Sequence, residues 1–302
     1  MKARAVWLIL CGIWGSTWLF IKVGLEDLPP LTFAGIRFVI ALAILCVVAR
    51  LRNARLPRTA ADWGHIAVTG ILAFTFNYGL LFWGEQHISS GLASVLQATI
   101  PAFGLVFAHL LLANERMTAA KVAGVALGIG GVAIVFANQL HADGPLALWG
   151  SAAIVVGALA AALSNVLIKR HKTAMDPAVL AAGQMVFGLV PLLVVGGVTE
   201  GNPLHFHWTP MAVICLLYLA IVGSSVAFYL YYWLIGKMDV TKTMLIALVT
   251  PILAVALGVL VLHEEVTWRL FLGGATILGG IAMITASRRR ELSVPPVSAT
   301  TD

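Results

Sequence analysis

The feature that most constrains the fold of this chain is an internal repeat of apolar segments. Residues 89–135 hold two apolar runs joined by a short polar turn, and residues 240–284 hold the same arrangement. A constant offset of 150 positions aligns six pairs of identical residues: Trp83 with Trp233, Pro101 with Pro251, Glu115 with Glu265, Gly124 with Gly274, Gly130 with Gly280 and Ile134 with Ile284. Four of these pairs are Gly, Pro or Trp, so we interpret the chain as one unit present twice.

Composition places both units in a membrane. The chain has 302 residues, of which 60% are hydrophobic and 11% charged, and its mean hydropathy is +0.97. Each apolar run is close to the roughly 20 residues that a helix needs to cross a bilayer. The net charge of +6 comes from short basic clusters between apolar runs, which indicates membrane topology rather than a nucleic-acid partner. A soluble globular fold is therefore excluded.

We predict an all-α integral membrane protein with ten transmembrane helices. The spans are expected at residues 5–25, 31–50, 63–84, 91–112, 119–138, 147–169, 176–199, 210–236, 241–262 and 269–287. The first repeat then covers residues 1–138 and the second covers residues 139–287. Residues 288–302 are basic and then rich in Ser, Thr and Pro, so they are expected to form a disordered cytoplasmic tail.

Basic residues predict the orientation of the spans. With a cytoplasmic N-terminus, sixteen Lys and Arg residues fall on inner segments and Arg269 alone on the outer ones. This bias places both termini in the cytoplasm. Because each half has five spans, the second half must enter the membrane upside down, as in transporters with inverted repeats. The first spans of the halves match more weakly at an offset of 147, which pairs Lys22 with Lys169 and Arg37 with Gln184.

Several motifs resemble those of a known family. They are IWGSTWLFIK (13–22), PLTFAGIRF (30–38), SSGLASVLQATIPAF (89–103) with NERMT (114–118), and TPILA with HEEVT in the second half. Over about residues 5–287 the chain resembles EamA-type carriers of the drug/metabolite transporter superfamily, and its aromatic and length pattern is similar to YddG-like amino-acid exporters. The resemblance implies a basket-like fold in the bacterial inner membrane. It also implies a central cavity lined by spans 1, 3, 4, 6, 8 and 9, and export of small metabolites.

Polar and aromatic side chains inside the spans are the candidate substrate contacts, because small-molecule sites are largely apolar with a few placed polar groups. Interhelical hydrogen bonding and lipid packing are the alternatives. The expected cargo is a small amphipathic molecule such as a neutral amino acid. The candidates are Trp14, Ser16, Thr17, Trp18, Asn77, Tyr78, Gln97, Thr99, Ser164, Asn165, Ser224, Ser225, Phe228, Tyr229 and Tyr232.

Other residues are expected to shape the fold. Pro101 and Pro251 should kink spans 4 and 9, either as hinges or simply for packing. Glu115 and Glu265 should cap the first turns of spans 5 and 10. Gly124 and Gly274 should allow spans 5 and 10 to pack closely, within the protein or between the protomers of a homodimer; a monomer is equally compatible. Arg37 should pair with acceptors or extend toward the interface.

Titratable residues give little sign of further chemistry. No Asp or Glu falls near the middle of a predicted span, so no proton relay is evident, and proton antiport, facilitated diffusion and exchange all stay open. The three cysteines lack paired spacing, and His205 with His207 is weak evidence for a metal. No catalytic motif occurs in the spans. We therefore expect a transporter without metal or cofactor; a multidrug or other metabolite exporter and a channel-like pore are the alternatives.

Overall fold

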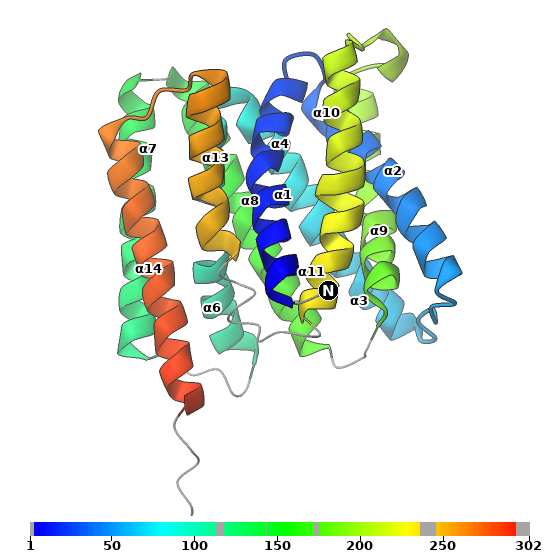
Figure 1. Ribbon diagram of the computed structural model, residues 1–302, viewed down its shortest axis with the longest axis horizontal. Coiled ribbons are helices and arrows are strands. Elements are labelled where there is room, and N and C mark those ends of the chain that lie inside the picture. The colour runs from blue at the N-terminus through cyan, green and yellow to red at the C-terminus, as the bar shows by residue number, and fades with distance from the viewer. Residues whose placement is uncertain (1–2, 113–117, 143, 172–174, 236–245, 294–302) are drawn as a thin grey trace, which may run out of the picture.

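The computed structural model describes residues 3–112, 118–142, 144–171, 175–235 and 246–293, and these residues form helices without any β-strand. The helices lie side by side between two ends, which we call upper and lower as they appear in Figure 1. Both the N-terminal helix and the last helix have their free ends at the lower end (Figure 1).

The first half of the chain contains eight helical elements. They are α1 (Ala3–Gly24), α2 (Pro30–Leu51), α3 (Ala60–Gly70), the π-helix η1 (Ile71–Tyr78), α4 (Gly79–His87), α5 (Ser90–Gln97), α6 (Ile100–Leu111) and α7 (Ala119–Ala142). The second half contains α8 (Gly144–Arg170), α9 (Pro177–Thr199), the 3₁₀ turn η2 (Pro203–His205), α10 (Pro210–Ala220), the π-helix η3 (Ile221–Val226), α11 (Ala227–Ile235), α13 (Ile246–Leu262) and α14 (Trp268–Ser293).

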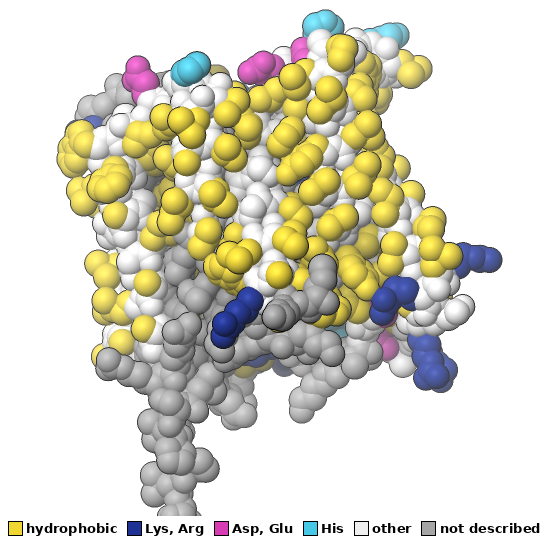
Figure 2. Space-filling view, in the orientation of Figure 1, with side chains coloured by type: hydrophobic (Ala, Val, Ile, Leu, Met, Phe, Trp, Pro, Cys, Tyr) yellow, Lys and Arg dark blue, Asp and Glu magenta, His cyan; other side chains and the backbone are white. Residues whose placement is uncertain are grey.

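Length and composition make this a multi-pass membrane protein. Seven helical segments of the described chain are long and apolar enough to cross a bilayer: Ala3–Gly24, Pro30–Leu51, Ala60–His87, Ser90–Leu111, Gly144–Arg170, Pro177–Thr199 and Pro210–Leu234. Shorter apolar helices occur at Ala119–Ile134 and Val249–Leu262. In Figure 2 hydrophobic side chains form a broad band between the two ends, and most Lys and Arg side chains of that face lie at its lower edge. The crossing of all ten predicted spans stays a prediction.

Two π-helical segments interrupt α-helices at equivalent places in the two halves. The η1 segment begins at Ile71 and η3 begins at Ile221, which are separated by the same 150 positions that align the sequence repeats. A π segment replaces i to i−4 hydrogen bonds by longer ones and is often found at functional sites. The η1 segment lies between α3 and α4, and the η3 segment lies between α10 and α11. The repeat in sequence is thus also a repeat in local backbone geometry.

The two prolines of the repeat have different effects. Before Pro101 the helix is interrupted at Ala98 and Thr99. The Ala98 amide is shared between the carbonyls of Ser94 and Val95, and the Thr99 amide bonds to the carbonyl three residues back; Pro101 then lies in the first turn of α6. A proline is well tolerated there because its missing N–H has no helical partner to lose. Pro251, by contrast, lies within α13, and the helix continues through it. The two prolines thus lie differently in the two halves: Pro101 follows a break in its span, and Pro251 lies inside a helix, where the expected kink stays a prediction.

Helices α7 and α14 form the most extensive helix pair of the described chain, as the repeated glycines predicted. The backbone of Gly124 faces Gly280 directly, whereas Gly274 packs against Val95 of α5. Helix α14 also continues to Ser293, so the expectation of a disordered tail from residue 288 is wrong for its first six residues. Arg, Glu and Leu, which dominate that stretch, are strong helix formers. Residues 294–302 lie outside the described part of the chain.

Close backbone approach between α7 and α14 generates a first prediction. A Cβ at Gly131 would lie 2.6 Å from the carbonyl oxygen of Gly273 and 2.9 Å from the amide nitrogen of Ile277, whereas a Cβ at Gly130 would meet nothing within 4 Å. We expect Gly131→Ala to lower the free energy of unfolding by about 1–3 kcal/mol through overpacking. Gly130→Ala is the matched control and should be neutral or slightly stabilising. Unfolding of both variants in mixed micelles measures this, and equal stability would contradict the packing described.

Candidate functional site

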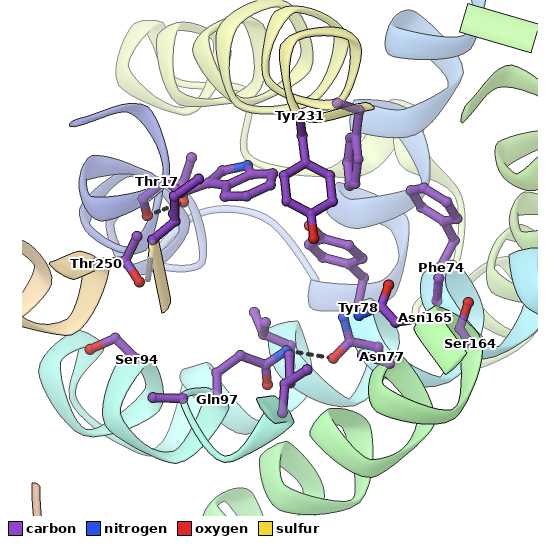
Figure 3. Close-up of a pocket in the computed structure, with 18 of the residues that line it drawn as sticks. Thr17, Phe74, Asn77, Tyr78, Ser94, Gln97, Ser164, Asn165, Tyr231 and Thr250 are labelled. Carbon is purple, nitrogen blue, oxygen red and sulfur yellow. Dashed lines mark hydrogen bonds between the residues drawn. The ribbon is translucent and has the colours of Figure 1, made fainter. Parts of the chain in front are cut away.

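A cavity of about 240 Å³ lies inside the bundle. Its walls come from α1, η1 with α4, α5 with α6, α8, α11 and α13, which correspond to the six spans that the family resemblance implied. Helices α2 and α9 each add one residue, Arg37 and Gln184. Figure 3 shows Thr250 and Ser94 on one side of the cavity, with Tyr78, Tyr231 and Asn165 on the other.

Most of the predicted substrate contacts come together around this cavity. Ten of them are among its lining residues: Trp14, Thr17, Trp18, Asn77, Tyr78, Gln97, Ser164, Asn165, Phe228 and Tyr232. Pro101, predicted as a hinge, also lines it. The sequence interpretation did not include Phe74, Ser94, Tyr231 or Thr250, which line it as well. Ser94 lies one turn before Gln97, so helical spacing from a polar candidate was the signal that would have found it.

Aromatic rings form one wall of the cavity. The ring of Trp14 lies 5.0 Å from that of Tyr231 and 6.1 Å from that of Phe228, centroid to centroid. Phe228 also packs against Phe74 at 5.4 Å, and Phe74 stacks on Tyr78 at 5.8 Å. Tilted and edge-to-face pairs at these separations are favourable. They join α1, η1 and α11 into a continuous apolar surface that suits an aromatic or aliphatic group.

Neutral polar groups form another part of the lining. The amide Nε2 of Gln97 donates a hydrogen bond of 2.6 Å to Oδ1 of Asn77, which joins α5 to η1 (Figure 3). Gln184 accepts from the Tyr232 hydroxyl at 2.9 Å and donates to the Thr69 hydroxyl at 3.1 Å. Oε1 of Gln97 has no hydrogen-bond partner among the described residues. Buried amides without partners are uncommon, so this oxygen is available to a ligand or to water.

Five predicted contacts lie away from the cavity lining and have local roles. Ser16 pairs with the Tyr218 hydroxyl at 2.6 Å, and Tyr229 accepts a hydrogen bond of 2.8 Å from Arg52. Thr99 and Ser225 donate to carbonyls of their own helical segments, at 2.7 and 2.8 Å. Ser224 accepts from Arg37. Sequence spacing identified their helices correctly but could not decide which face meets the cavity.

Arg37 pairs with hydrogen-bond acceptors, one of the two expected alternatives, but the sequence interpretation did not place it at the cavity. Expected to have a structural role, it lines the cavity, and it is only 1% exposed. Its Nε donates a hydrogen bond of 2.8 Å to the Ser224 hydroxyl, which ties α2 to η3. Its counterpart at the offset of 147 is Gln184, which also lines the cavity. The signal in the sequence for this position was that a charged residue, Arg37, and an amide residue, Gln184, lie at equivalent places inside their spans.

Glu85 corrects another expectation. The carboxylate of Glu85, near the upper end of α4, is fully buried at 0% exposure, and neither of its oxygens has a hydrogen-bond partner among the described residues. The Lys22 ammonium donates to the main-chain carbonyls of Glu85 and Ile88, at 2.9 and 2.7 Å, rather than to the carboxylate. Glu85 follows the cavity residue Leu81 by one helical turn. A buried acidic group therefore exists just beyond the cavity, although the sequence indicated none.

The family of the chain follows from its sequence profile. The profile of the EamA-like transporter family matches residues 3–137 and again residues 148–286. The chain belongs to the EamA-like transporter family. It is thus a carrier of the drug/metabolite transporter superfamily.

Similar proteins cover nearly all of this EamA chain. An uncharacterized transporter, YoaV, from Bacillus subtilis (strain 168) is 31% identical over 92% of this chain and 95% of its own length. A probable terminal-alkyne amino-acid exporter from Streptantibioticus cattleyicolor is 30% identical over 97% of this chain and 98% of its own. An uncharacterized inner membrane transporter, YedA, from Escherichia coli (strain K12) is 28% identical over 91% and 88%. A solved crystal structure with 22% sequence identity has the same fold, with a TM-score of 0.68 over 97% of this chain and 99% of that chain.

Two carboxylates cap helices of this EamA transporter across long sequence distances at the upper end. Glu264, in the α13–α14 loop, accepts from the amides of Ser90 and Gly91, at 2.7 and 3.2 Å, at the start of α5. Glu200 accepts from the amides of Leu31 and Thr32 at the start of α2. Anionic groups are stabilising at helix N-termini, where amides lack partners. These contacts hold the first half of the bundle to the second.

The predicted capping glutamates are therefore corrected in part. The first turn of α14 is capped by Thr267, whose hydroxyl accepts from the Leu270 amide at 3.2 Å, while Glu265 is exposed. A threonine directly before the helix has the geometry that an N-cap requires, and Glu265 lies too far upstream. Glu115 lies outside the described residues.

Asp27, in the turn between α1 and α2, connects this turn to the residues before α10 at the upper end. Its carboxylate accepts from the Thr209 hydroxyl and lies 2.8 Å from Nδ1 of His207. The Thr209 hydrogen bond contributes most, and His207 adds to it, in holding the pKa of Asp27 below its ordinary value. The ionised carboxylate thus links the α1–α2 turn to the start of α10 at neutral pH.

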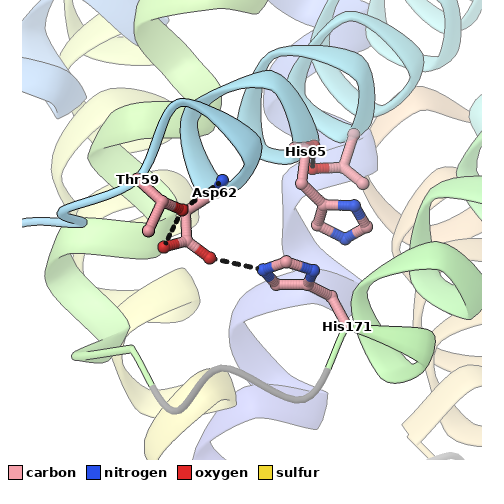
Figure 4. A network of polar contacts seen from close by, with 5 residues as sticks. Thr59, Asp62, His65 and His171 are labelled. Atoms are coloured by element: carbon pink, nitrogen blue, oxygen red, sulfur yellow. Dashed lines mark hydrogen bonds and ion pairs between the residues drawn. The ribbon is translucent and has the colours of Figure 1, made fainter.

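A separate polar network ties α3 to the end of α8 at the lower end (Figure 4). Asp62 lies 2.6 Å from Nε2 of His171, and the Thr59 hydroxyl donates to Asp62 at 2.7 Å. The ring of His65 stacks on that of His171 at 4.2 Å. Within the described ranges no group of three or more His, Cys, Asp or Glu side chains is arranged to hold a metal ion. The network therefore belongs to helix packing.

The Glu264 cap generates a second prediction. Glu264→Ala should lower the free energy of unfolding by about 1–3 kcal/mol, because the Ser90 and Gly91 amides lose a charged acceptor. Glu265→Ala removes the exposed neighbouring carboxylate and is the matched control, with an expected change within about 0.5 kcal/mol. Unfolding of the Glu264→Ala and Glu265→Ala variants in mixed micelles measures the two changes in free energy. A larger loss in the Glu265 variant would show that the capping residue is assigned wrongly.

Proposed function

We propose that this protein exports small amphipathic metabolites, above all neutral and aromatic amino acids, across the bacterial inner membrane by alternating access. The observation that carries the proposal is the cavity, which combines an aromatic wall with neutral amide and hydroxyl groups in about 240 Å³. This size is slightly below the roughly 300–1,000 Å³ of drug-sized sites, so it suits a small cargo. A relative named as a probable amino-acid exporter supports the choice of substrate.

The proposed topology has ten spans in two inverted five-helix repeats. Its support is the offset of 150 residues, which relates both the sequence motifs and the two π segments. We assign the lower end to the cytoplasm because most Lys and Arg side chains visible in Figure 2 lie there. The described ends of the chain, in α1 and α14, also lie at the lower end (Figure 1). Both termini are then cytoplasmic.

Transport requires that the two ends of the cavity open in turn. In the described conformation the upper end is held by the Glu264 and Glu200 caps. Opening that end would release these contacts while the substrate stays at the cavity. The interruption at Ala98 and Thr99, next to the cavity residue Pro101, is the proposed hinge, since a few residues outside regular helix absorb the change in backbone angles.

Efflux from proteoliposomes tests the proposed function. Purified protein is reconstituted with a mixture of amino acids inside, and efflux and counterflow are followed with and without a pH gradient. We expect saturable efflux, which separates a carrier from a pore. A complete lack of amino-acid flux would contradict the proposal.

Substitutions in the cavity test its role in the same assay. Trp14→Ala, Trp18→Ala and Gln97→Ala should each lower efflux by about 5- to 30-fold, which corresponds to about 1–2 kcal/mol of lost binding. Trp149→Ala is the matched control, because that tryptophan lies on α8 outside the cavity lining and is 65% exposed on the surface of the bundle. Unchanged efflux in all three cavity variants would show that the pocket is assigned wrongly.

A further inference from the structure

The lining of the cavity contains one charged side chain. Among its described lining residues Arg37 is the single charged side chain, and no Asp or Glu is present. None of the ion pairs found in the described part of the chain involves Arg37. A guanidinium group stays protonated in proteins. The lining therefore contributes a net positive charge in surroundings that water screens poorly.

The contacts of Arg37 leave part of its hydrogen-bonding capacity unused. Nε and Nη2 donate to the Ser224 hydroxyl and to the Gly223 carbonyl, at 2.8 and 3.3 Å. The guanidinium carbon lies 5.0 to 5.6 Å from the ring centroids of Phe38, Tyr78 and Phe82. Nη1 has no hydrogen-bond partner among the described residues. The side chain is thus held in place by neutral groups. The buried carboxylate of Glu85 acts on it electrostatically but makes no hydrogen bond or ion pair with it among the described residues.

A buried cation with no carboxylate in direct contact is costly, and a carboxylate that binds it directly lowers that cost. The planar guanidinium fork matches a carboxylate with two parallel hydrogen bonds. We propose that the cavity requires a carboxylate on its cargo and that Arg37 is the residue that recognises it. This inference rests on the proposed export function and specifies its substrate class.

Other groups at the cavity fit the second half of an amino acid. The unpartnered Oε1 of Gln97 is an acceptor suited to an ammonium group. Gln184, which occupies the position equivalent to Arg37 in the second half, adds an uncharged amide. The charge of the lining therefore comes from the first half of the chain only. This favours the orientation in which the carboxylate of a zwitterion points toward Arg37.

Neighbouring charges do not reverse this preference. Beyond the cavity, Glu85 offsets part of the Arg37 charge without forming an ion pair with it, and Lys22 next to Glu85 adds a second cation. A cationic amphiphile would place its charge against Arg37 without a carboxylate in the lining to hold it. The site is thus suited to carboxylates and unsuited to cationic drugs, which supports an amino-acid exporter over an exporter of cationic drugs.

The test compares three ligands that differ only in their charged groups. Purified full-length protein in detergent is titrated with L-phenylalanine, with 3-phenylpropionate, which lacks the ammonium, and with phenethylamine, which lacks the carboxylate. Thermal stabilisation reports binding. We expect phenylalanine and phenylpropionate to bind, and phenethylamine to bind at least about 10-fold more weakly. This comparison needs no variant, so it does not depend on how a substitution folds.

Variants then assign the effect to Arg37. Arg37→Gln should weaken binding of phenylalanine about 10- to 100-fold and leave phenethylamine unaffected or improved. Arg37→Lys should retain part of the affinity, because the charge remains while the fork is lost. Arg52→Gln is the matched control: Arg52 directly follows the helix that carries Arg37, as its C-cap, and contacts the aromatic ring and the hydroxyl of Tyr229 outside the cavity lining. The Arg52→Gln variant should bind phenylalanine with the affinity of the wild type.

The outcomes separate this inference from the proposed function. Equal binding of phenethylamine and phenylalanine, wild-type affinity in Arg37→Gln, or no binding of any of the three would overturn the carboxylate requirement. Efflux of amines without carboxylates from proteoliposomes would overturn it while leaving the exporter in place. Carboxylate binding that depends on Arg37, without any amino-acid efflux, would support the inference and contradict the export function.

Discussion

The absence of water inside a bilayer is the constraint on which the rest of this structure depends. Within hydrocarbon every backbone N–H and C=O must find a partner in the protein, so helices are the only economical solution. Where helices of this chain begin, side chains accept hydrogen bonds from backbone amides that have no partner within the helix. The start of α5 is capped by Glu264 and the start of α2 by Glu200, although both acids are more than 160 residues away along the chain. Helix ends are thus satisfied by the opposite half, which joins the two repeats into one bundle.

The same constraint makes it costly to bury polar groups that lack hydrogen-bond partners. Among the buried polar atoms without hydrogen-bond partners in the described chain are Oε1 of Gln97, Nη1 of Arg37 and both carboxylate oxygens of Glu85; those of Thr32, His65 and Ser151 lie elsewhere. Each such group costs free energy in an apolar interior, and the atoms of Gln97, Arg37 and Glu85 lie at or next to one cavity. Stability alone does not explain their position. The proposed function accounts for the groups in the cavity lining, because a polar cargo would satisfy them only while it is bound.

Much of the cavity could be predicted because polar residues inside apolar spans have few alternatives. Asn77, Gln97, Ser164 and Asn165 were identified from this rule, and all four line the cavity. Ser224 and Tyr229 follow the same rule, yet they contact Arg37 and Arg52 instead. A helix places residues only one or two positions apart on different faces, so a small error in rotation exchanges a cavity residue for a packing residue. Glu85 was missed for a related reason: it lies just past the end of a predicted span, where only the tertiary fold buries it.

By itself, the sequence determined that the chain is helical, lies in a membrane, contains a repeat and belongs to its family, because apolar length, composition and motif order are properties of the chain alone. Tertiary structure decided where each half meets the other. It showed that Pro101 follows a break whereas α13 continues through Pro251, that Glu264 rather than its neighbour caps a helix, and that Arg37 reaches the cavity. These outcomes depend on helix rotation and on contacts between residues far apart in sequence. Local pattern contains no information on either, since both are set by how whole helices pack.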